Sequence, residues 1–499
     1  MTQIKKTTSD QLETVFYKSK TELNKPEKIC ITSNKIDTGL LKNPQIIDED
    51  GKIQIPRWGW GIRIAIVIFL LAVFTHVIIQ AVQLGDPFMI HSVSASILSI
   101  LVLVLAWNFY RNPANGELGN ALVSVIIPIY NQASMIRLVI DYIYNSSYKN
   151  LEVIAVNDGS SDGTKEILDD IAKKYPTLKI IHKKNEGKRK AVATGFLNSQ
   201  GTYIINIDSD SIIDSKAIEE FVKTFEKDKK IGSVVANVKT WNKKKNFLTK
   251  IQDVWYDVSF NISKASESKF GLVLCCSGCM AGYRRDAVIN YIPIWMKANK
   301  ITGDDRELTS LVIYKANFRT DLLAAFAQKQ LEYSSQFDDS EDRMLTAQAL
   351  VEWKSVYVAS AVVYTDVPEK MKGFLKQQMR WKKGYLRGQF FVSTFFWLKN
   401  PVMAFIFYLE FMSTITIPLV LFTVLIYEPL VTGRYWFTVF FVLSQTAVGF
   451  IEGLDSKLRN RQSTTWKFKP LMNLVTIFIV SWMVFPALWN LRKNEWGTR

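Results

Sequence analysis

Cysteine and histidine are scarce in this sequence, which limits the kinds of site that it can build. Its 499 residues include four cysteines and three histidines. The cysteines are Cys30, Cys275, Cys276 and Cys279, and the last three cluster in the segment CCSGC. A structural zinc ion takes four Cys or His ligands, but His76, His91 and His182 are all distant from this cluster in the sequence. We therefore expect buried thiols of a reducing compartment rather than disulfides or a zinc site.

Acidic residues are also few, with 46 against 62 basic residues and a formal charge of +16. Such a balance suggests nucleic-acid binding. The basic residues lie beside apolar runs, however, where the topology of a membrane protein explains them. Residues 1–57 are polar and rich in Lys, Thr and Ser, and they lack the apolar core of a signal peptide. We expect a polar cytosolic tail, no cleavable leader and no nucleic-acid partner.

Long apolar runs flank a more polar middle segment. A membrane span needs about 20 apolar residues, and five runs approach that length: 62–84, 89–109, 408–427, 435–453 and 470–491. Basic residues flank the first two runs and fill the loop 455–469, and such residues favour the cytosolic side. Four spans place the middle segment in the cytosol. If the last run also crossed, the basic tail would lie outside, so we expect a buried or interfacial last helix, with five spans as the alternative.

The resulting division has six parts. They are a polar tail (1–57), two transmembrane helices (58–110), a cytosolic domain (111–370), amphipathic interface helices (371–400), two transmembrane helices (401–455), and a basic loop, last helix and tail (456–499). The helix pattern in 372–397 alternates Lys and Arg with large apolar residues, which suits the headgroup region of a bilayer.

The middle segment alternates predicted strands with predicted helices. Strands are expected at 121–129, 151–156, 179–182 and 203–207, and helices at 133–144, 164–174 and 190–199. This alternation predicts an α/β domain with a parallel sheet. Ligands bind such sheets beyond the carboxyl ends of the strands, and polar residues gather at those ends.

Three groups of residues stand at the predicted ligand edge. Asp158 ends the second strand, where it can contact a nucleoside or cap a helix. Asp208 and Asp210 follow the strand 203–207 and point the same way in an extended segment. Their paired carboxylates suit Mg²⁺ or Mn²⁺ bridging to a diphosphate. The basic cluster 188–190 can neutralise phosphate charge or stay in solvent.

The order of these motifs resembles the family 2 nucleotide-sugar glycosyltransferases. They run VSVIIPIYN, VNDGSSDGT, GKRKA and DSD along the chain. The resemblance implies an α/β, Rossmann-like GT-A catalytic domain that uses UDP-sugars. It further implies that Asp158 contacts the uridine, Lys188 the diphosphate, Asp208 the diphosphate and metal, and Asp210 the metal.

Two later motifs resemble the acceptor side of membrane-embedded synthases. The segment around Ser277 and Gly278 is similar to the one that lines the acceptor site in that group. Gln377, Arg380 and Trp381 form QxxRW, which resembles the signature of cellulose, chitin and hyaluronan synthases. Trp381 offers a flat face to the acceptor sugar, Arg380 a cation to the leaving diphosphate, and Gln377 amide hydrogen bonds.

Sugar transfer needs a base that deprotonates the acceptor hydroxyl, and two similar acidic segments compete for this role. They are GDDRELT, which contains Asp305, and SEDRMLT, which contains Asp342. Spacing back to Ser277 favours Asp305. Spacing forward to QxxRW favours Asp342, which we predict to be the catalytic base.

The chain ends in WGTR, which resembles the end of bacterial hyaluronan synthases. There the segment acts as a gating loop over the nucleotide, so Trp496, Thr498 and Arg499 are expected donor contacts. Together the resemblances imply a multi-pass plasma-membrane synthase that extends a polysaccharide, hyaluronan first, and passes it through its own channel. Chitin or poly-N-acetylglucosamine is the alternative product. A non-processive glycolipid transferase and a polysaccharide receptor are the alternatives from other classes.

Overall fold

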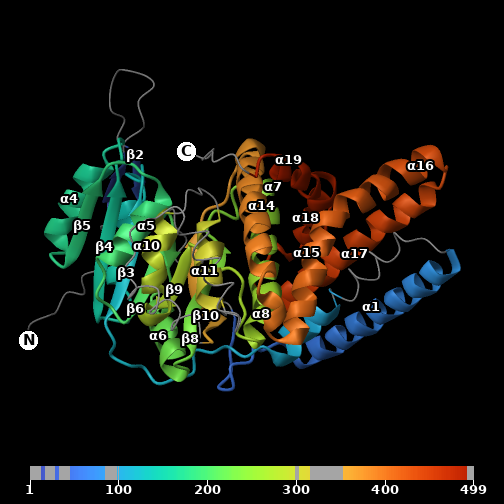
Figure 1. The fold of residues 1–499 in the computed structure, drawn as a ribbon, viewed down its shortest axis with the longest axis horizontal. Helices are drawn as coiled ribbons and strands as arrows, with labels where there is room; N and C mark the ends of the chain where they lie inside the picture. The colour runs from blue at the N-terminus through green and yellow to red at the C-terminus, as the bar shows by residue number, and fades with distance from the viewer. Residues whose placement is uncertain are drawn as a thin grey trace, which may run out of the picture.

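A computed structural model describes the chain at residues 13–16, 29–32, 45–84, 98, 100–297, 303–314 and 352–491. In Figure 1 a sheet with its covering helices fills one end of the molecule and long helices fill the other. Two helices stand between them, α7 (Phe247–Val258) and α14 (Met371–Ser393).

Eight strands form one mixed sheet. The strands are β3 (Val123–Ile129), β4 (Leu151–Asp158), β5 (Leu178–Lys183), β6 (Tyr203–Ile207), β7 (Ile212–Ile213), β8 (Ile231–Thr240), β9 (Met280–Arg284) and β10 (Lys354–Thr365). Their order is β5-β4-β3-β6-β9-β8-β10-β7. β3 pairs in parallel with β4 and β6, and β4 pairs in parallel with β5, as the sequence predicts. β8 and β10 also pair in parallel. β9 runs antiparallel between β6 and β8, and β7 runs antiparallel to β10, neither of which was expected.

Short helices cover the sheet. They are α3 (Ile136–Tyr144), α4 (Thr164–Lys174), α5 (Lys188–Leu197), α6 (Ala217–Lys227), α8 (Ala265–Lys269), α9 (Arg285–Val288), α10 (Ile292–Lys297) and α11 (Asp304–Ile313). Every residue of β3 and of β8 is buried. Runs of β-branched residues form such strands because both faces of the sheet pack against other elements.

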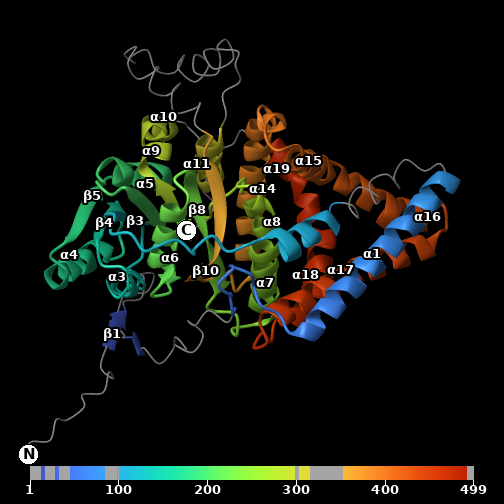
Figure 2. The ribbon, with the colours of Figure 1, turned by 90° about the horizontal axis from the view of Figure 1, so that it is seen from below.

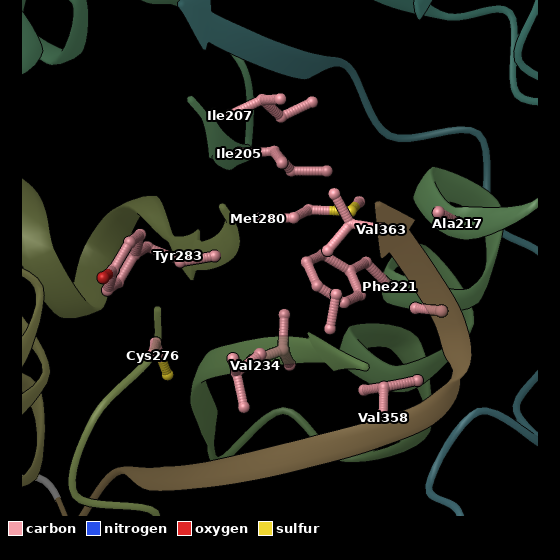
Figure 3. Packing of buried hydrophobic residues seen from close by; sticks show 14 of the residues in the cluster. Ile205, Ile207, Ala217, Phe221, Val234, Cys276, Met280, Tyr283, Val358 and Val363 are labelled. Carbon is pink, nitrogen blue, oxygen red and sulfur yellow. The ribbon is translucent and has the colours of Figure 1, made fainter. Parts of the chain in front are cut away.

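Figure 3 shows the packing at the middle of this sheet. Phe221 of α6 is fully buried beside Val234, Met280 and Val363, which come from three different strands. A Cβ on Gly282 would lie 2.8 Å from the Phe221 ring. Glycine at this position therefore lets the ring pack directly on β9.

Long helices and several short ones form the second half of the molecule (Figure 2). They are α1 (Arg57–Leu84), α15 (Pro401–Phe422), α16 (Glu428–Val431), α17 (Tyr435–Arg459), α18 (Lys469–Val475) and α19 (Val484–Trp489). In the described part of the chain, three stretches are long and apolar enough to cross a membrane: Pro401–Val431, Tyr435–Arg459 and Trp466–Trp489. The last one meets that criterion by length and composition, so its interfacial placement stays a prediction.

The predicted tail and the predicted interface helices make contacts that the sequence did not reveal. In the tail, Gln45 is buried and hydrogen bonds to Asn261 at 2.8 Å. Within the tail, β1 (Glu13–Phe16) also pairs with β2 (Ile29–Thr32). The helix α14 buries Phe374, Leu386 and other residues against its neighbours, so it is packed between the two halves of the protein.

Truncation of Phe221 tests how far the domain depends on this packing. We expect Phe221→Ala to destabilise the domain by about 3–5 kcal/mol, because a fully buried ring leaves a cavity. The melting temperature of the detergent-solubilised protein would fall by roughly 10 °C. Leu197→Ala, at a residue that is 47% exposed, is the matched control. Equal melting temperatures for the two variants would contradict the prediction.

Candidate active site

Charged side chains from distant parts of the sequence meet beyond the carboxyl ends of β4 and β6. Asp158 is the last residue of β4, Asp208 follows β6, and Lys188 begins α5. This is the edge at which open α/β sheets bind ligands, and it is where the sequence places these residues.

Asp158 is buried and holds the loop that precedes α5. Its Oδ1 accepts hydrogen bonds from Glu186 N and Lys183 Nζ, both at 3.0 Å, and its Oδ2 accepts one from Gly187 N at 2.8 Å. Gly187 has φ +96°, a conformation that glycine adopts readily. Asp158 thus fixes the turn that leads into Lys188, and its contact with a uridine stays a prediction.

Lys188 connects the donor edge to a second carboxylate. Its Nζ lies 2.5 Å from Asp208 Oδ1. Burial opposes the charge of this ammonium group, but Asp208 and Asp305 outweigh it and raise the Lys188 pKa above its usual value. A lysine held in this charged state is suited to a phosphate ligand.

Of the predicted basic cluster 188–190, only Lys188 contacts Asp208 at the donor edge. Arg189 turns away and bridges to α11, with Nη2 at 2.6 Å from Asp304 Oδ1 and 2.7 Å from Glu307 Oε2. Lys190 pairs with Glu186 at 3.0 Å. Arg189 therefore has a positioning role that sequence spacing did not reveal, because its partners lie more than a hundred residues away.

Asp208 and Asp210 lie in the turn after β6, and both are partly exposed. Two carboxylates supply hard oxygen ligands of the kind that Mg²⁺ and Mn²⁺ prefer, and such ions often take their remaining ligands from phosphates and water. In the described residues, no group of three or more His, Cys, Asp or Glu side chains could hold a metal ion alone. The pair therefore fits a metal that arrives with a diphosphate.

Cys279 lies close enough to both aspartates to feel their charge. Burial, followed by Asp208 and Asp210, raises the pKa of the Cys279 thiol to about 12. The thiol stays protonated and does not add a soft thiolate ligand. Of the three free thiols in the CCSGC segment, Cys276 is buried, and Cys275 and Cys279 are partly buried.

Gly278 is the junction between the donor edge and α11. Its carbonyl accepts a hydrogen bond from Asp208 N at 3.1 Å, and its N–H donates to Asp305 Oδ2 at 2.9 Å. A Cβ at this position would lie 2.9 Å from Asp305 Oδ1 and 3.1 Å from Lys188 Nζ. Only glycine lets these two charged groups come so close to the backbone.

Asp305 is therefore part of the site. It is the second residue of α11, after Gly303. Burial raises the pKa of Asp305, although Lys188 draws it down, and a raised pKa favours proton acceptance near neutrality. Asp342, the base that we predicted, lies outside the described residues, as do Trp496, Thr498 and Arg499.

The QxxRW residues on α14 face the same site. Trp381 stacks on Trp255 with ring centres 5.4 Å apart and meets Tyr256 edge-on at 6.0 Å. Arg380 is close enough for its charge to act on both Lys188 and Asp305. Gln377 Oε1 is buried and accepts no hydrogen bond from the described residues.

Glycines bring α14 against α11. A Cβ on Gly303 would lie 2.8 Å from the Gly384 Cα, and a Cβ on Gly388 would overlap the Arg306 side chain. Gly384 and Gly388 are four residues apart and so lie on one face of the helix. Their spacing after QxxRW was a signal available in the sequence that we did not use.

Comparison with known proteins gives a consistent result. Residues 124–292 match the family Glycosyl transferase family 2. The chain is 26% identical over 414 residues to a hyaluronan synthase of Streptococcus pyogenes, covering 81% of this chain and 89% of that one. It is 26% identical over 388 residues to an N-acetylglucosaminyltransferase of Rhizobium meliloti (strain 1021), covering 76% and 81%.

Among solved structures, a mannosyltransferase from Pyrobaculum calidifontis, in complex with GDP-Man and Mn²⁺, aligns over 82% of this chain and 99% of that one. The TM-score is 0.41 and the identity 17%.

The α/β sheet, the charged edge and the apolar helices define a membrane-associated glycosyltransferase with the expected GT-A fold. Its residues 124–292 match glycosyl transferase family 2, and its predicted likeness to the hyaluronan synthases is confirmed.

Gly278→Ala tests the junction. The added methyl group would push Asp305 and Lys188 apart, and small displacements of reacting groups are costly, so we expect sugar transfer to fall by at least about tenfold. Gly61→Ala, where a Cβ would meet no atom within 4 Å, is the control. Radiolabelled sugar incorporated by purified protein measures the effect. Wild-type activity in Gly278→Ala would show that sugar transfer does not depend on the close approach at Gly278.

Proposed function

We propose that the protein is a processive hyaluronan synthase that uses UDP-N-acetylglucosamine and UDP-glucuronate. The observation that carries the proposal is the convergence of Lys188, Asp208 and Asp305 around Gly278, beside an aromatic platform at Trp381. One half of this arrangement suits a nucleoside diphosphate, and the other half suits a sugar acceptor.

The donor half binds UDP at the edge of β4 and β6. Asp158 orders the uridine side of the loop, and Lys188 neutralises diphosphate charge. Asp208 and Asp210 would hold Mg²⁺ or Mn²⁺, because their carboxylates supply the oxygen ligands that these ions prefer. The bound ion supplies positive charge to the departing diphosphate.

The transfer step is an in-line displacement at the anomeric carbon. The acceptor hydroxyl oxygen forms a bond to that carbon while the bond to the β-phosphate oxygen breaks, so the configuration inverts. We propose that Asp305 accepts the hydroxyl proton, since it is partly buried close to Lys188 and accepts a hydrogen bond from Gly278 N. Arg380 and Lys188 stabilise the negative charge on UDP as it leaves.

The acceptor half guides the growing chain. Trp381 stacks against the sugar, and Gln377 and the Ser277 segment hydrogen bond to its hydroxyls. Because α14 leads directly into α15, the product would enter the membrane helices from this platform. We further propose that the plasma membrane holds the helices, that the sheet domain is cytosolic, and that Trp496, Thr498 and Arg499 close over the nucleotide.

The streptococcal relative supports hyaluronan, because that protein is named hyaluronan synthase. A second candidate product is a chitin-like polymer of N-acetylglucosamine alone. It is favoured by the rhizobial relative, which is named N-acetylglucosaminyltransferase. The two candidates differ in their donors.

A donor-omission assay tests the product. We expect purified protein in proteoliposomes to make high-mass polymer only when both UDP-N-acetylglucosamine and UDP-glucuronate are present with Mn²⁺ or Mg²⁺, and EDTA to abolish it. Gel filtration of radiolabelled product measures this. Polymer from UDP-N-acetylglucosamine alone would favour the chitin-like candidate, and donor hydrolysis without polymer would rule out a processive synthase.

A pair of substitutions tests the base. Asp305→Asn should lower sugar transfer by about a hundredfold or more, the usual effect of losing a general base, while UDP binding persists. Asp342→Asn should have little effect. Initial rates and UDP affinity, measured by fluorescence titration, separate the two roles. If Asp342→Asn abolished transfer and Asp305→Asn had little effect, Asp342 would be the base.

A further inference from the structure

Five charged side chains form a line of buried ion pairs between the sheet and the membrane helices. We call them the buried charge line: Lys239 of β8, Asp257 of α7, Arg459 and Asp455 of α17, and Arg63 of α1. Arg459 is 4% exposed and Asp455 fully buried. None of the five belongs to the donor edge or to the QxxRW motif.

The contacts along the line alternate in sign. Lys239 Nζ lies 2.6 Å from Asp257 Oδ1, and Asp257 Oδ2 lies 2.9 Å from Arg459 Nη2. Arg459 Nε lies 2.8 Å from Asp455 Oδ2, and Asp455 Oδ1 lies 2.9 Å from Arg63 Nη2. The line therefore joins a strand, an interface helix and two long helices.

Such a line is costly to bury and is weak evidence for stability. Its partners must meet with good geometry, because a displaced partner leaves an unpaired buried charge. Burial raises the pKa of Asp257, but Arg459 and Lys239 hold it well below its usual range, so the carboxylate stays ionised. The line thus fixes where α7 lies relative to α17.

A second contact reinforces the same position. Asp253, one helical turn before Asp257, accepts hydrogen bonds from Thr240 Oγ1 and from Thr465 Oγ1, both at 2.5 Å. Thr240 ends β8, and Thr465 lies in the loop after α17. The contact with Thr240 joins α7 to the sheet, and the contact with Thr465 joins α7 to the loop after α17.

The helix α7 also carries the support of the acceptor platform. Trp255 and Tyr256 immediately precede Asp257, and both contact the Trp381 ring. Any shift of α7 would move these rings beneath Trp381. The residue that anchors α7 to the membrane half is therefore adjacent to the residues that support the acceptor.

We propose that the buried charge line positions the acceptor platform, with Asp257 and Arg459 as positioning residues that keep Trp381 in register with α17. This inference rests on the proposed function, because it assumes that Trp381 holds a growing chain. Neither residue touches the donor, so loss of the line should spare donor use. Loss of the line should cause early release of the growing chain. More UDP should then form for each sugar that is added to the polymer.

The test uses full-length protein in proteoliposomes and three variants. Asp257→Asn keeps the shape of the side chain but removes its charge. The double variant Lys239→Met and Asp257→Asn removes one positive and one negative charge. It loses both ion pairs of Asp257 but leaves no unpaired Lys239. Glu152→Gln is the matched control, because Glu152 is a buried carboxylate on β4 that accepts a hydrogen bond from Gly201 N at 3.1 Å and pairs with Lys179.

Polymer length, UDP released per sugar incorporated and melting temperature are measured for each variant. We expect Asp257→Asn to shorten the polymer about fivefold, the equivalent of one weakened aromatic stack, and to raise UDP release per sugar. The double variant should recover the melting temperature but still make short polymer. Glu152→Gln should lower the melting temperature without shortening the polymer.

Four outcomes would overturn the inference. Wild-type polymer length in both Asp257 variants would show that the line does not act on the acceptor. Recovered polymer length in the double variant would show that only the unpaired charge of the single variant shortens the polymer. Equal shortening in Glu152→Gln would make the effect one of general stability. If the wild-type protein itself makes no polymer, the proposed function fails and the inference fails with it.

Discussion

The ion pair between Asp257 and Arg459 joins α7, which stands between the two halves of the protein, to α17, and the way in which the two halves meet depends on it. Opposite charges are needed there because an unpaired charge away from water is strongly destabilising. Lys239 and Asp455 extend the pair on either side, so a strand and a membrane helix must align for all contacts to form. Once α7 is fixed in this way, its aromatic rings can support Trp381.

The same constraint organises the donor edge. Lys188 lies partly buried between Asp208 and Asp305, and its charge compensates two carboxylates that would otherwise repel each other. Gly278 makes this approach possible because it adds no side chain at the crossing. The charges that hold α11 against the sheet are also charges that a nucleotide diphosphate and a sugar hydroxyl can use, so fold and chemistry share one set of residues.

Much of the site was predictable where the position of a residue depends on its neighbours in the sequence. The ends of the strands 151–156 and 203–207 place Asp158 and Asp208 at one edge, since parallel strands end on the same side, and the structure has them there. The choice between Asp305 and Asp342 was not local. Spacing along the chain gave opposite answers for the two segments. The structure places Asp305 beside Gly278, and Asp342 lies outside the described residues. The turn of Arg189 toward Asp304 was hidden for the same reason.

By itself, the sequence determined the α/β alternation, the apolar runs and the order of the family motifs. Periodicity and residue type act over a few neighbours, so these features can be read without coordinates. Only the tertiary structure decided that β9 enters antiparallel, that glycines let α14 meet α11, and that five distant charges form one line. These contacts join residues up to several hundred positions apart, and their cost or benefit exists only once burial has removed the water between them.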